Sequence, residues 1–249
     1  MSFWEIARKY ILVHKCGCCR QILDRDHFDD ALCPKCRILW NKSLVESCKK
    51  CLRPAIECEC MPGAMAGEGA LCLRRLFFYE SEATYSPSMS IIFMLKHKNI
   101  RRITDFAARQ LLPSIKEALS ALDFEDNREA FFVCSVPRGR TKIREYGFDH
   151  GVLLASRIAQ LLEVEYVKAF SSTFFSTEQK ALDRKGRFKN AQKRIRFCDE
   201  AEVKGRYAIL FDDIVTTGAS MSACVRLLRK AGAKGVLCFS LASSKKDIR

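Results

Sequence analysis

The stretch from Tyr207 to Ser220 constrains the fold of this chain more than any other. It starts with an apolar run (207–211), continues with the adjacent carboxylates Asp212 and Asp213, and ends in small hydroxyl residues and a glycine before a helical pattern. A short apolar run of this kind is typical of a buried parallel strand. The pattern therefore predicts a strand that ends at the acidic pair, then a loop, then the start of a helix.

The residues of this loop indicate a ligand with both phosphate and sugar groups. Gly218 lets backbone N–H groups approach a ligand, and the positive end of the following helix dipole favours an anion. Hydroxyl side chains can donate hydrogen bonds to phosphate. Asp212 and Asp213 suit sugar hydroxyls or a hydrated magnesium ion. The alternative is an ordinary N-capped helix start, but a cap requires neither two carboxylates nor a doubled threonine.

The segment Asp212–Ser220 resembles the signature of type I phosphoribosyltransferases, which bind phosphoribosyl pyrophosphate (PRPP). The match is contiguous, with Ile214 and Ser220 as mild variants. The resemblance implies that Asp212 and Asp213, the expected catalytic residues, contact the ribose hydroxyls. The following loop would wrap the 5′-phosphate with Thr216, Thr217, Gly218, Ala219 and Ser220. The implied fold is α/β, with a parallel sheet flanked by helices.

Length and hydropathy set the broad class. A chain of 249 residues can hold one α/β domain and a small module. It has no uninterrupted apolar run of membrane-spanning length, and Met1–Tyr10 lacks the order of a secretory signal. We therefore expect a cytoplasmic protein without membrane insertion. Residues 63–249 carry 32 Lys and Arg against 21 Asp and Glu, so that part should bind a polyanion.

Cysteine pairs in the first quarter of the chain predict zinc. Nine of the 14 cysteines lie between Cys16 and Cys60, mostly as pairs two residues apart, which in a cytosolic chain is typical of zinc ligation. The first expected site consists of Cys16, Cys19, Cys33 and Cys36. The second, with a less regular last pair, consists of Cys48, Cys51, Cys58 and Cys60.

Several alternatives for these cysteines remain open. We expect one or two structural Zn²⁺ ions, but Cys18 could replace Cys16 or Cys19 or be a free thiol. His14 and His27 are fallback ligands, and the whole set could be reduced cysteines without metal. The predicted N-terminal helix and zinc-ribbon module occupies residues 1–62, because the glycine-rich stretch 61–70 reads as a domain boundary. A type I phosphoribosyltransferase-like domain then spans 63–249.

Other strands and helices of this domain follow from apolar patterns. Strands are expected at 71–79, 130–137, 164–170 and 236–242, and helices at 89–97, from Ile103, and from Leu153. The basic run after the second strand, Arg138, Gly139 and Arg140, lies at the edge where open α/β sheets bind ligands. The phosphoribosyltransferase resemblance implies that it holds the pyrophosphate of PRPP, the alternative being a solvated basic turn. Lys96 is a further candidate.

A strongly basic segment follows the predicted strand at 164–170. Residues 168–196 contain nine Lys and Arg against two acids, which predicts either a solvated loop or a lid that closes over a polyanion. Aromatic residues among the charges could stack on nucleic-acid bases or pack in the core. These aromatic residues are Phe170, Phe174, Phe175 and Phe188.

Three patterns together resemble the ComF family of bacterial phosphoribosyltransferase-like proteins. They are the cysteine-rich head, Gly147-Phe148, and the spaced residues Gln179, Leu182, Arg187 and Asn190. The resemblance implies a zinc-ribbon head, a lid containing Gln179, Arg187 and Asn190, and a role in handling incoming single-stranded DNA. The family usually has Arg-Gly-Phe-Asn followed by glutamine, whereas this chain has Tyr146 to His150. Arg144 could compensate for the missing arginine.

We therefore expect a ComF-type protein that binds PRPP with Mg²⁺ and transfers the phosphoribosyl group to an acceptor in DNA uptake or competence. Arg138 and Arg140 would neutralise the leaving pyrophosphate. The expected partners are PRPP, single-stranded DNA and competence or DNA-processing proteins. The alternatives are a single-stranded nucleic-acid-binding protein and a PRPP-responsive regulator without turnover.

Overall fold

The computed structural model describes residues 13–79, 86–172, 193–198 and 202–244. The predicted N-terminal helix and the residues Gln179, Arg187 and Asn190 lie outside these ranges, as do Phe174, Phe175 and Phe188. The helices are α2 (Pro34–Leu44), α3 (Gly63–Gly67), α4 (Pro87–His97), α5 (Arg101–Leu119), α6 (Arg140–Tyr146), α7 (His150–Leu162) and α9 (Ala219–Lys230). The strands are β1 (Ala70–Tyr79), β2 (Phe131–Ser135), β3 (Glu165–Tyr166), β4 (Phe170–Ser172), β5 (Ile195–Phe197), β6 (Tyr207–Val215) and β7 (Gly235–Ser244).

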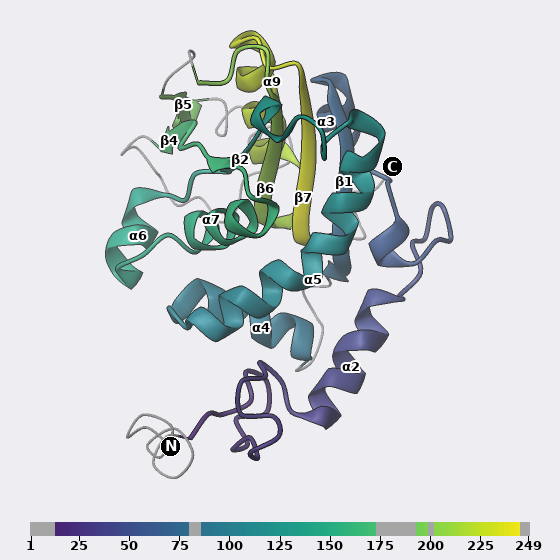
Figure 1. Ribbon diagram of the computed structural model, residues 1–249, viewed down its shortest axis with the longest axis vertical. Coiled ribbons are helices and arrows are strands. Elements are labelled where there is room, and N and C mark those ends of the chain that lie inside the picture. The colour runs from purple at the N-terminus through teal and green to yellow at the C-terminus, as the bar shows by residue number, and fades with distance from the viewer. Residues whose placement is uncertain (1–12, 80–85, 173–192, 199–201, 245–249) are drawn as a thin grey trace.

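Five of the strands form one parallel sheet in the order β1-β7-β6-β2-β3, with helices on both faces (Figure 1). Successive residues of a strand point to opposite faces. Ile209 and Phe211 of β6 accordingly belong to the core beneath α4, α5 and α7, whereas Ala208 and Leu210 belong to the core beneath α3 and α9. The predicted α/β class with a parallel sheet flanked by helices is confirmed.

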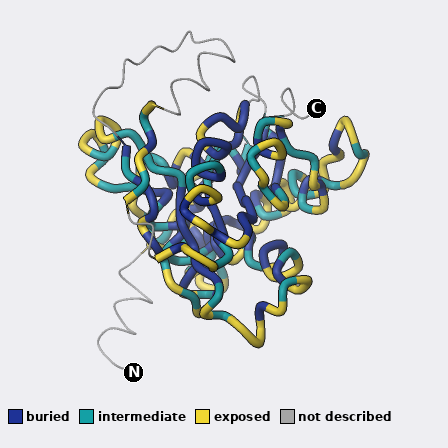
Figure 2. Tube along the Cα trace, turned by 90° about the horizontal axis from the view of Figure 1, so that it is seen from above, coloured by how far each residue is buried: buried dark blue, intermediate teal, exposed yellow. Residues whose placement is uncertain are grey.

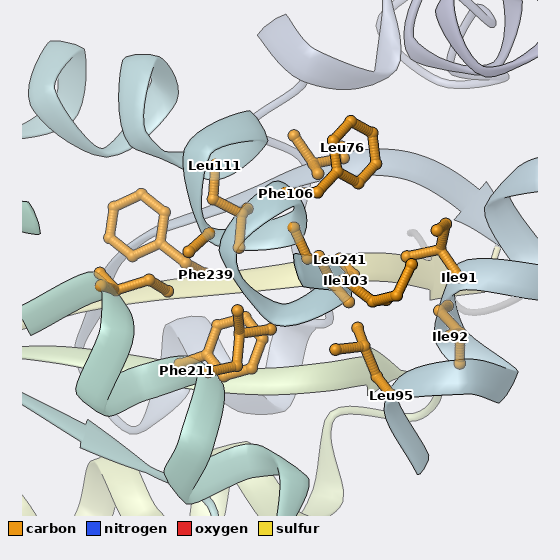
Figure 3. Close-up of a cluster of buried hydrophobic side chains, with 14 of the residues drawn as sticks. Leu76, Ile91, Ile92, Leu95, Ile103, Phe106, Leu111, Phe211, Phe239 and Leu241 are labelled. Atoms are coloured by element: carbon orange, nitrogen blue, oxygen red, sulfur yellow. The ribbon is translucent and has the colours of Figure 1, made fainter. Parts of the chain in front are cut away.

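The core under α4 and α5 is built from aliphatic and aromatic side chains (Figure 3). Ile103 and Leu111 of α5 are buried with Leu241 of β7 and Phe211 of β6. The spacing of the apolar residues of α5 places them on one helix face, which packs on the sheet. Figure 2 shows the buried residues gathered in the centre of the molecule, with exposed residues along the connecting segments.

Strand order creates a switch point between β2 and β6. The connection from β2 runs through α6 and α7 to β3 on one side, and the connection from β6 runs through α9 to β7 on the other. Helices α7 and α9 pack on opposite faces of the sheet. The carboxyl ends of β2 and β6 therefore flank a crevice, the position where open α/β sheets bind ligands.

The structure corrects three details of the sequence-based prediction. β6 does not end at the acidic pair: Asp212 pairs with Ser240 and Ile214 with Ala242, because β7 continues beside it. The strand predicted at 164–170 is split into β3 and β4, since a tight turn from Val167 to Ala169 interrupts it, and β4 pairs antiparallel with β5. Phe170 is buried and packs on Phe197, as the core alternative required.

The third correction concerns the basic run after β2. It is not a free loop throughout, because α6 begins at Arg140. The glycine-rich stretch 61–70 also contains structure: α3 packs against α9, and its Met65 is fully buried. No helix in the described ranges is long and apolar enough to cross a membrane.

The cysteine-rich head packs on the sheet domain. Trp40 of α2 is fully buried, with edge-to-face contacts to Phe77 of β1 and Phe106 of α5. Its Nε1 donates a hydrogen bond of 2.8 Å to Oε1 of Gln110. Head and sheet domain consequently share one hydrophobic core.

Candidate functional site

The acidic pair lies where β6 runs past the end of β2. The last residue pair between these strands is Ser135 with Phe211, so the backbone from Asp212 onward is bordered by β7 alone among the strands of the sheet. The other side opens into a cleft of about 370 Å³. The strand register, rather than a flexible loop, thus holds both carboxylates at the crevice.

Asp213 is held by side chains from two distant helices. Its Oδ2 lies 2.9 Å from Nζ of Lys96, the penultimate residue of α4, and 2.8 Å from Nε2 of His150, the first residue of α7. Its Oδ1 accepts a hydrogen bond of 2.7 Å from the backbone N–H of Ile214. Asp212 Oδ1 accepts from the backbone N–H of Asp213 at 2.9 Å.

These contacts give the two carboxyl groups opposite pKa shifts. Burial raises the pKa of Asp212 well above its ordinary value, and the negative charge of Asp213 raises it further. Burial also raises the pKa of Asp213, but the His150 hydrogen bond and the positive charge of Lys96 outweigh it and hold that pKa well below its ordinary value. Asp213 is therefore the more acidic of the two coupled carboxyl groups.

Cationic and aromatic residues also line the cleft. Arg138 Nη2 donates to the Lys96 carbonyl at 3.2 Å and Nη1 to the Phe148 carbonyl at 3.4 Å, with the guanidinium 5.0 Å from the centroid of the Tyr146 ring. Tyr146 also contacts the His97 ring edge to face. Tyr146, which stands where the ComF pattern has an arginine, thus contacts the guanidinium of Arg138.

Positive charge also acts on His97. Burial lowers the pKa of His97, and the charges of Arg138 and Lys96 lower it further. Cationic side chains and the acidic pair thus line the same cleft, and the cationic side chains suit an anionic group.

The predicted phosphate loop connects β6 to α9. Gly218 has φ +75°, a left-handed conformation that glycine adopts without strain. Thr217 is buried and its Oγ1 accepts from the backbone N–H of Ala219 at 3.4 Å, whereas Thr216 and Ser220 are exposed. Of the loop residues, Ser220 lines the cleft.

Apart from Arg138, the candidates of the basic run do not line the cleft. Arg138 lines the cleft, but Arg140 is exposed and lines a neighbouring cavity of about 380 Å³. Gly139 lies between them, and a Cβ placed there would be 3.0 Å from Nη2 of Arg194. Arg144 is exposed and is not among the residues that line the cleft.

Sequence reasoning singled out Lys96 but missed the contributions of His97 and Lys142 to this cleft. It noted His150 only as a departure from the ComF pattern. His97 follows Lys96 directly, and Lys142 is four residues after Arg138. That His150 contacts Asp213 depends on two segments that are 63 residues apart in the chain, and no local pattern indicates such a pair.

The cysteines form two separate groups that fit structural zinc. Cys16, Cys19, Cys33 and Cys36 make up one group, and Cys48, Cys51, Cys58 and Cys60 make up the other, each with its sulfurs within 4.8 Å of one another. Four cysteine sulfurs at such distances are typical of a tetrahedral Zn²⁺ site. The first group includes Cys16 and Cys19 rather than Cys18. The histidines bond elsewhere, His14 to the Phe28 carbonyl and His27 to Asp24.

Each group contains one thiol whose pKa is lowered to about 7, Cys16 in the first and Cys48 in the second, whereas burial raises the pKa of Cys58 to about 12. Burial raises the pKa of Cys16, but backbone N–H groups of Cys33 and Cys18 outweigh it and lower that pKa to about 7. In the second group, Nη1 of the fully buried Arg75 donates to Cys58 Sγ at 2.8 Å, and its Nη2 donates to the Cys60 carbonyl. A buried guanidinium needs an anionic partner, which a zinc-bound tetrathiolate would supply.

The fold and the crevice define a phosphoribosyltransferase-like α/β protein. Residues 149–248 match the phosphoribosyl transferase domain family. The crystal structure of an adenine phosphoribosyltransferase is 17% identical, with a TM-score of 0.35, over 55% of this chain and 69% of that chain. A phosphoribosylpyrophosphate synthetase from Mycobacterium smegmatis is 22% identical over 51% of this chain but only 32% of its own length, with a TM-score of 0.33.

Two curated relatives narrow the class. DNA utilization protein YhgH from Escherichia coli K12 is 28% identical over 163 residues, which are 64% of this chain and 69% of that protein. Competence protein ComFC from Streptococcus pneumoniae R6 is 24% identical over 215 residues, 86% of this chain and 88% of that protein. The predicted resemblance to ComF proteins is confirmed.

Proposed function

We propose that this protein binds PRPP together with Mg²⁺ in the cleft at the ends of β2 and β6, and transfers the phosphoribosyl group to an acceptor in DNA uptake or utilization. The observation that carries the proposal is that Asp212, Asp213 and Arg138 line one cleft together with Ser220, at the end of the loop that starts at Thr216. PRPP has the matching order of groups: a 5′-phosphate, a ribose with two hydroxyls, and a pyrophosphate.

Each part of the cleft would bind one part of PRPP. Asp212 and Asp213 accept hydrogen bonds from the ribose hydroxyls, the β6–α9 turn donates backbone N–H groups to the 5′-phosphate, and Arg138 stabilises the pyrophosphate as it leaves. The carboxylate of Asp212, next to an already ionised Asp213, fits a hydrated Mg²⁺, which would neutralise phosphate charge when bound.

In the reaction, the bond from the anomeric carbon to pyrophosphate breaks and the pyrophosphate takes the electron pair. A lone pair of the acceptor then forms the new bond, and the acceptor loses its proton. The positive charge that develops on the ribose is stabilised by the nearby carboxylates, so catalysis rests on positioning and electrostatics. The proposal specifies the acceptor only by its chemistry: it is a nucleophile, either a nucleobase or a nucleic acid.

Calorimetric titration of PRPP with Mg²⁺, run beside a pyrophosphate-release assay with a panel of bases and nucleic acids, tests both parts. We expect the wild-type protein to bind PRPP and Asp212→Asn/Asp213→Asn to lose that binding. Binding without pyrophosphate release would favour the regulator without turnover. Absence of PRPP binding by the wild-type protein would refute the proposal.

A role in single-stranded nucleic-acid binding stays a prediction. It rests on the basic segment 168–196 and on the printed names of the two relatives, which refer to DNA utilization and competence. Most of that segment lies outside the described residues. That the protein is located in the cytoplasm is also a proposal.

A further inference from the structure

Two helices that are far apart in the chain contact one oxygen atom of Asp213, which itself belongs to β6. Lys96 at the end of α4 and His150 at the start of α7 both contact Oδ2, at 2.9 and 2.8 Å, while Oδ1 accepts from the Ile214 N–H. Both carboxylate oxygens of Asp213 are therefore fixed by the protein itself. Such a carboxylate has one orientation, whereas an unrestrained aspartate can rotate about χ1 and χ2.

His150 is not needed for the local structure of α7. The N-cap is Asp149, whose Oδ1 accepts from the backbone N–H groups of Gly151 and Val152. The imidazole of His150 is nonetheless buried, at 8% exposure, and its Nδ1 has no hydrogen-bond partner among the described residues. A buried polar atom without a partner costs free energy, so capping and packing do not explain this histidine.

We propose that His150 is a positioning residue, which together with Lys96 holds the Asp213 carboxylate at the edge of β6 in the orientation that meets the ribose hydroxyls of PRPP. This inference rests on the proposed function and deepens it. In this proposal His150 acts through Asp213, although its side chain also lines the cleft. Because the contact is made by Nε2–H, a glutamine amide at position 150 can donate a comparable hydrogen bond, whereas alanine cannot.

The first test needs no ligand. The chain has four histidines, so the imidazole nitrogens can be resolved by ¹⁵N NMR at pH 7, and the spectrum of His150→Gln assigns those of His150. We expect Nε2 of His150 to carry a proton and its resonance to shift in Asp213→Asn. An unprotonated Nε2, or a resonance that does not respond to Asp213→Asn, overturns the proposal.

The second test is PRPP titration of His150→Ala and His150→Gln. Loss of a hydrogen bond to a charged group corresponds to about tenfold weaker binding, which we expect for His150→Ala. His150→Gln should remain within about threefold of the wild type, because the donor is retained. The matched control is His27→Ala, which removes another histidine–aspartate contact, with exposed Asp24, outside the cleft.

The outcomes separate the two proposals. If the wild type binds PRPP and His150→Ala binds it with the same affinity, the positioning role is refuted but the proposed function is not. The same holds if His150→Gln and His150→Ala weaken PRPP binding equally. If the wild type does not bind PRPP, the proposed function is refuted, and with it the role of His150 in directing Asp213 toward the ribose. The NMR measurement still decides whether His150 contacts Asp213. If His150→Ala does not fold, His150→Gln and the NMR measurement decide.

Discussion

At the scale of single residues, the two neighbouring carboxyl groups have different tasks. Asp213 is ionised and engaged by Lys96 and His150, whereas the half-buried Asp212 lies beside that charge without a cation of its own among the described residues. Asp212 therefore costs stability in the free protein. Unfavourable electrostatics of this kind are typical of ligand-binding sites.

Substitution of the two aspartates should consequently change stability in opposite directions. The raised pKa of Asp212 means that its unfavourable contribution is present at neutral pH and disappears as the pH falls to the ordinary value near 3.8. We expect Asp212→Asn to raise the free energy of unfolding at pH 7 by about 1 kcal/mol. Urea denaturation at pH 7 and pH 4 measures this, and equal gains at both pH values would contradict it.

Asp213→Asn should be destabilising. Because the pKa of Asp213 is lowered, its contribution is fully present above the ordinary value near 3.8 and is lost only as the pH falls below it. Leaving Lys96 and His150 without an anionic partner should lower the free energy of unfolding at pH 7 by about 2 kcal/mol. A neutral or stabilising effect would show that these contacts do not stabilise the fold.

At the scale of elements, the turn between β6 and α9 packs against the segment that joins the cysteine-rich head to the sheet. A Cβ added at Gly218 would lie 3.0 Å from Cγ of Pro62 and 3.1 Å from Cγ of Met65. Met65 belongs to α3, only a few residues after Cys60. The predicted phosphate loop is therefore packed directly against the segment that follows the second cysteine group.

Gly218→Ala should destabilise the protein by about 3 kcal/mol, since it combines left-handed backbone strain with a collision against Pro62 and Met65. It should also weaken PRPP binding. Gly205→Ala is the matched control, because Gly205 has nearly the same φ, +76°, but nothing within 4 Å of its Cβ position. We expect about 1 kcal/mol for this control. Equal losses of unfolding free energy in the two variants would exclude the collision.

At the scale of the whole molecule, the head is part of the structure of the sheet domain. Trp40 packs between β1 and α5, and buried Arg75 of β1 donates to Cys58. Loss of metal from the second cysteine group would leave this guanidinium with a weaker partner, and removing one member of a buried charge pair is strongly destabilising. Head and sheet domain should therefore unfold together.

We expect two zinc ions per wild-type chain, one in Cys58→Ser, and two in the control Cys198→Ser, whose cysteine is exposed and outside both groups. Cys58→Ser should lower the free energy of unfolding by about 3 kcal/mol. Elemental analysis measures the metal. In a Trp4→Phe background, Trp40 fluorescence and circular dichroism should report one coincident transition; a separate early transition of Trp40 would show that the head unfolds alone.

Much of the fold could be predicted from the sequence because local patterns of apolar residues specify it. The apolar run at 207–211 and the periodic apolar residues of α5 specify a strand and a helix by their spacing. The split of the strand predicted at 164–170 could not be predicted from the sequence. It depends on the pairing of β3 with β2 and of β4 with β5. The extension of β6 through Asp212 was missed for the same reason, since β7 supplies its partner.

The sequence alone determined the α/β class, the two cysteine groups, and the identity of the acidic pair with its following loop, because each is encoded by contiguous residues with definite chemistry. The tertiary structure decided which residues share the cleft. It brought Lys96, Arg138 and His150 to Asp213 and its surroundings, and it left Arg140 in the neighbouring cavity. Such contacts join segments from different elements, whose meeting is set by strand order and helix packing and not by spacing along the chain.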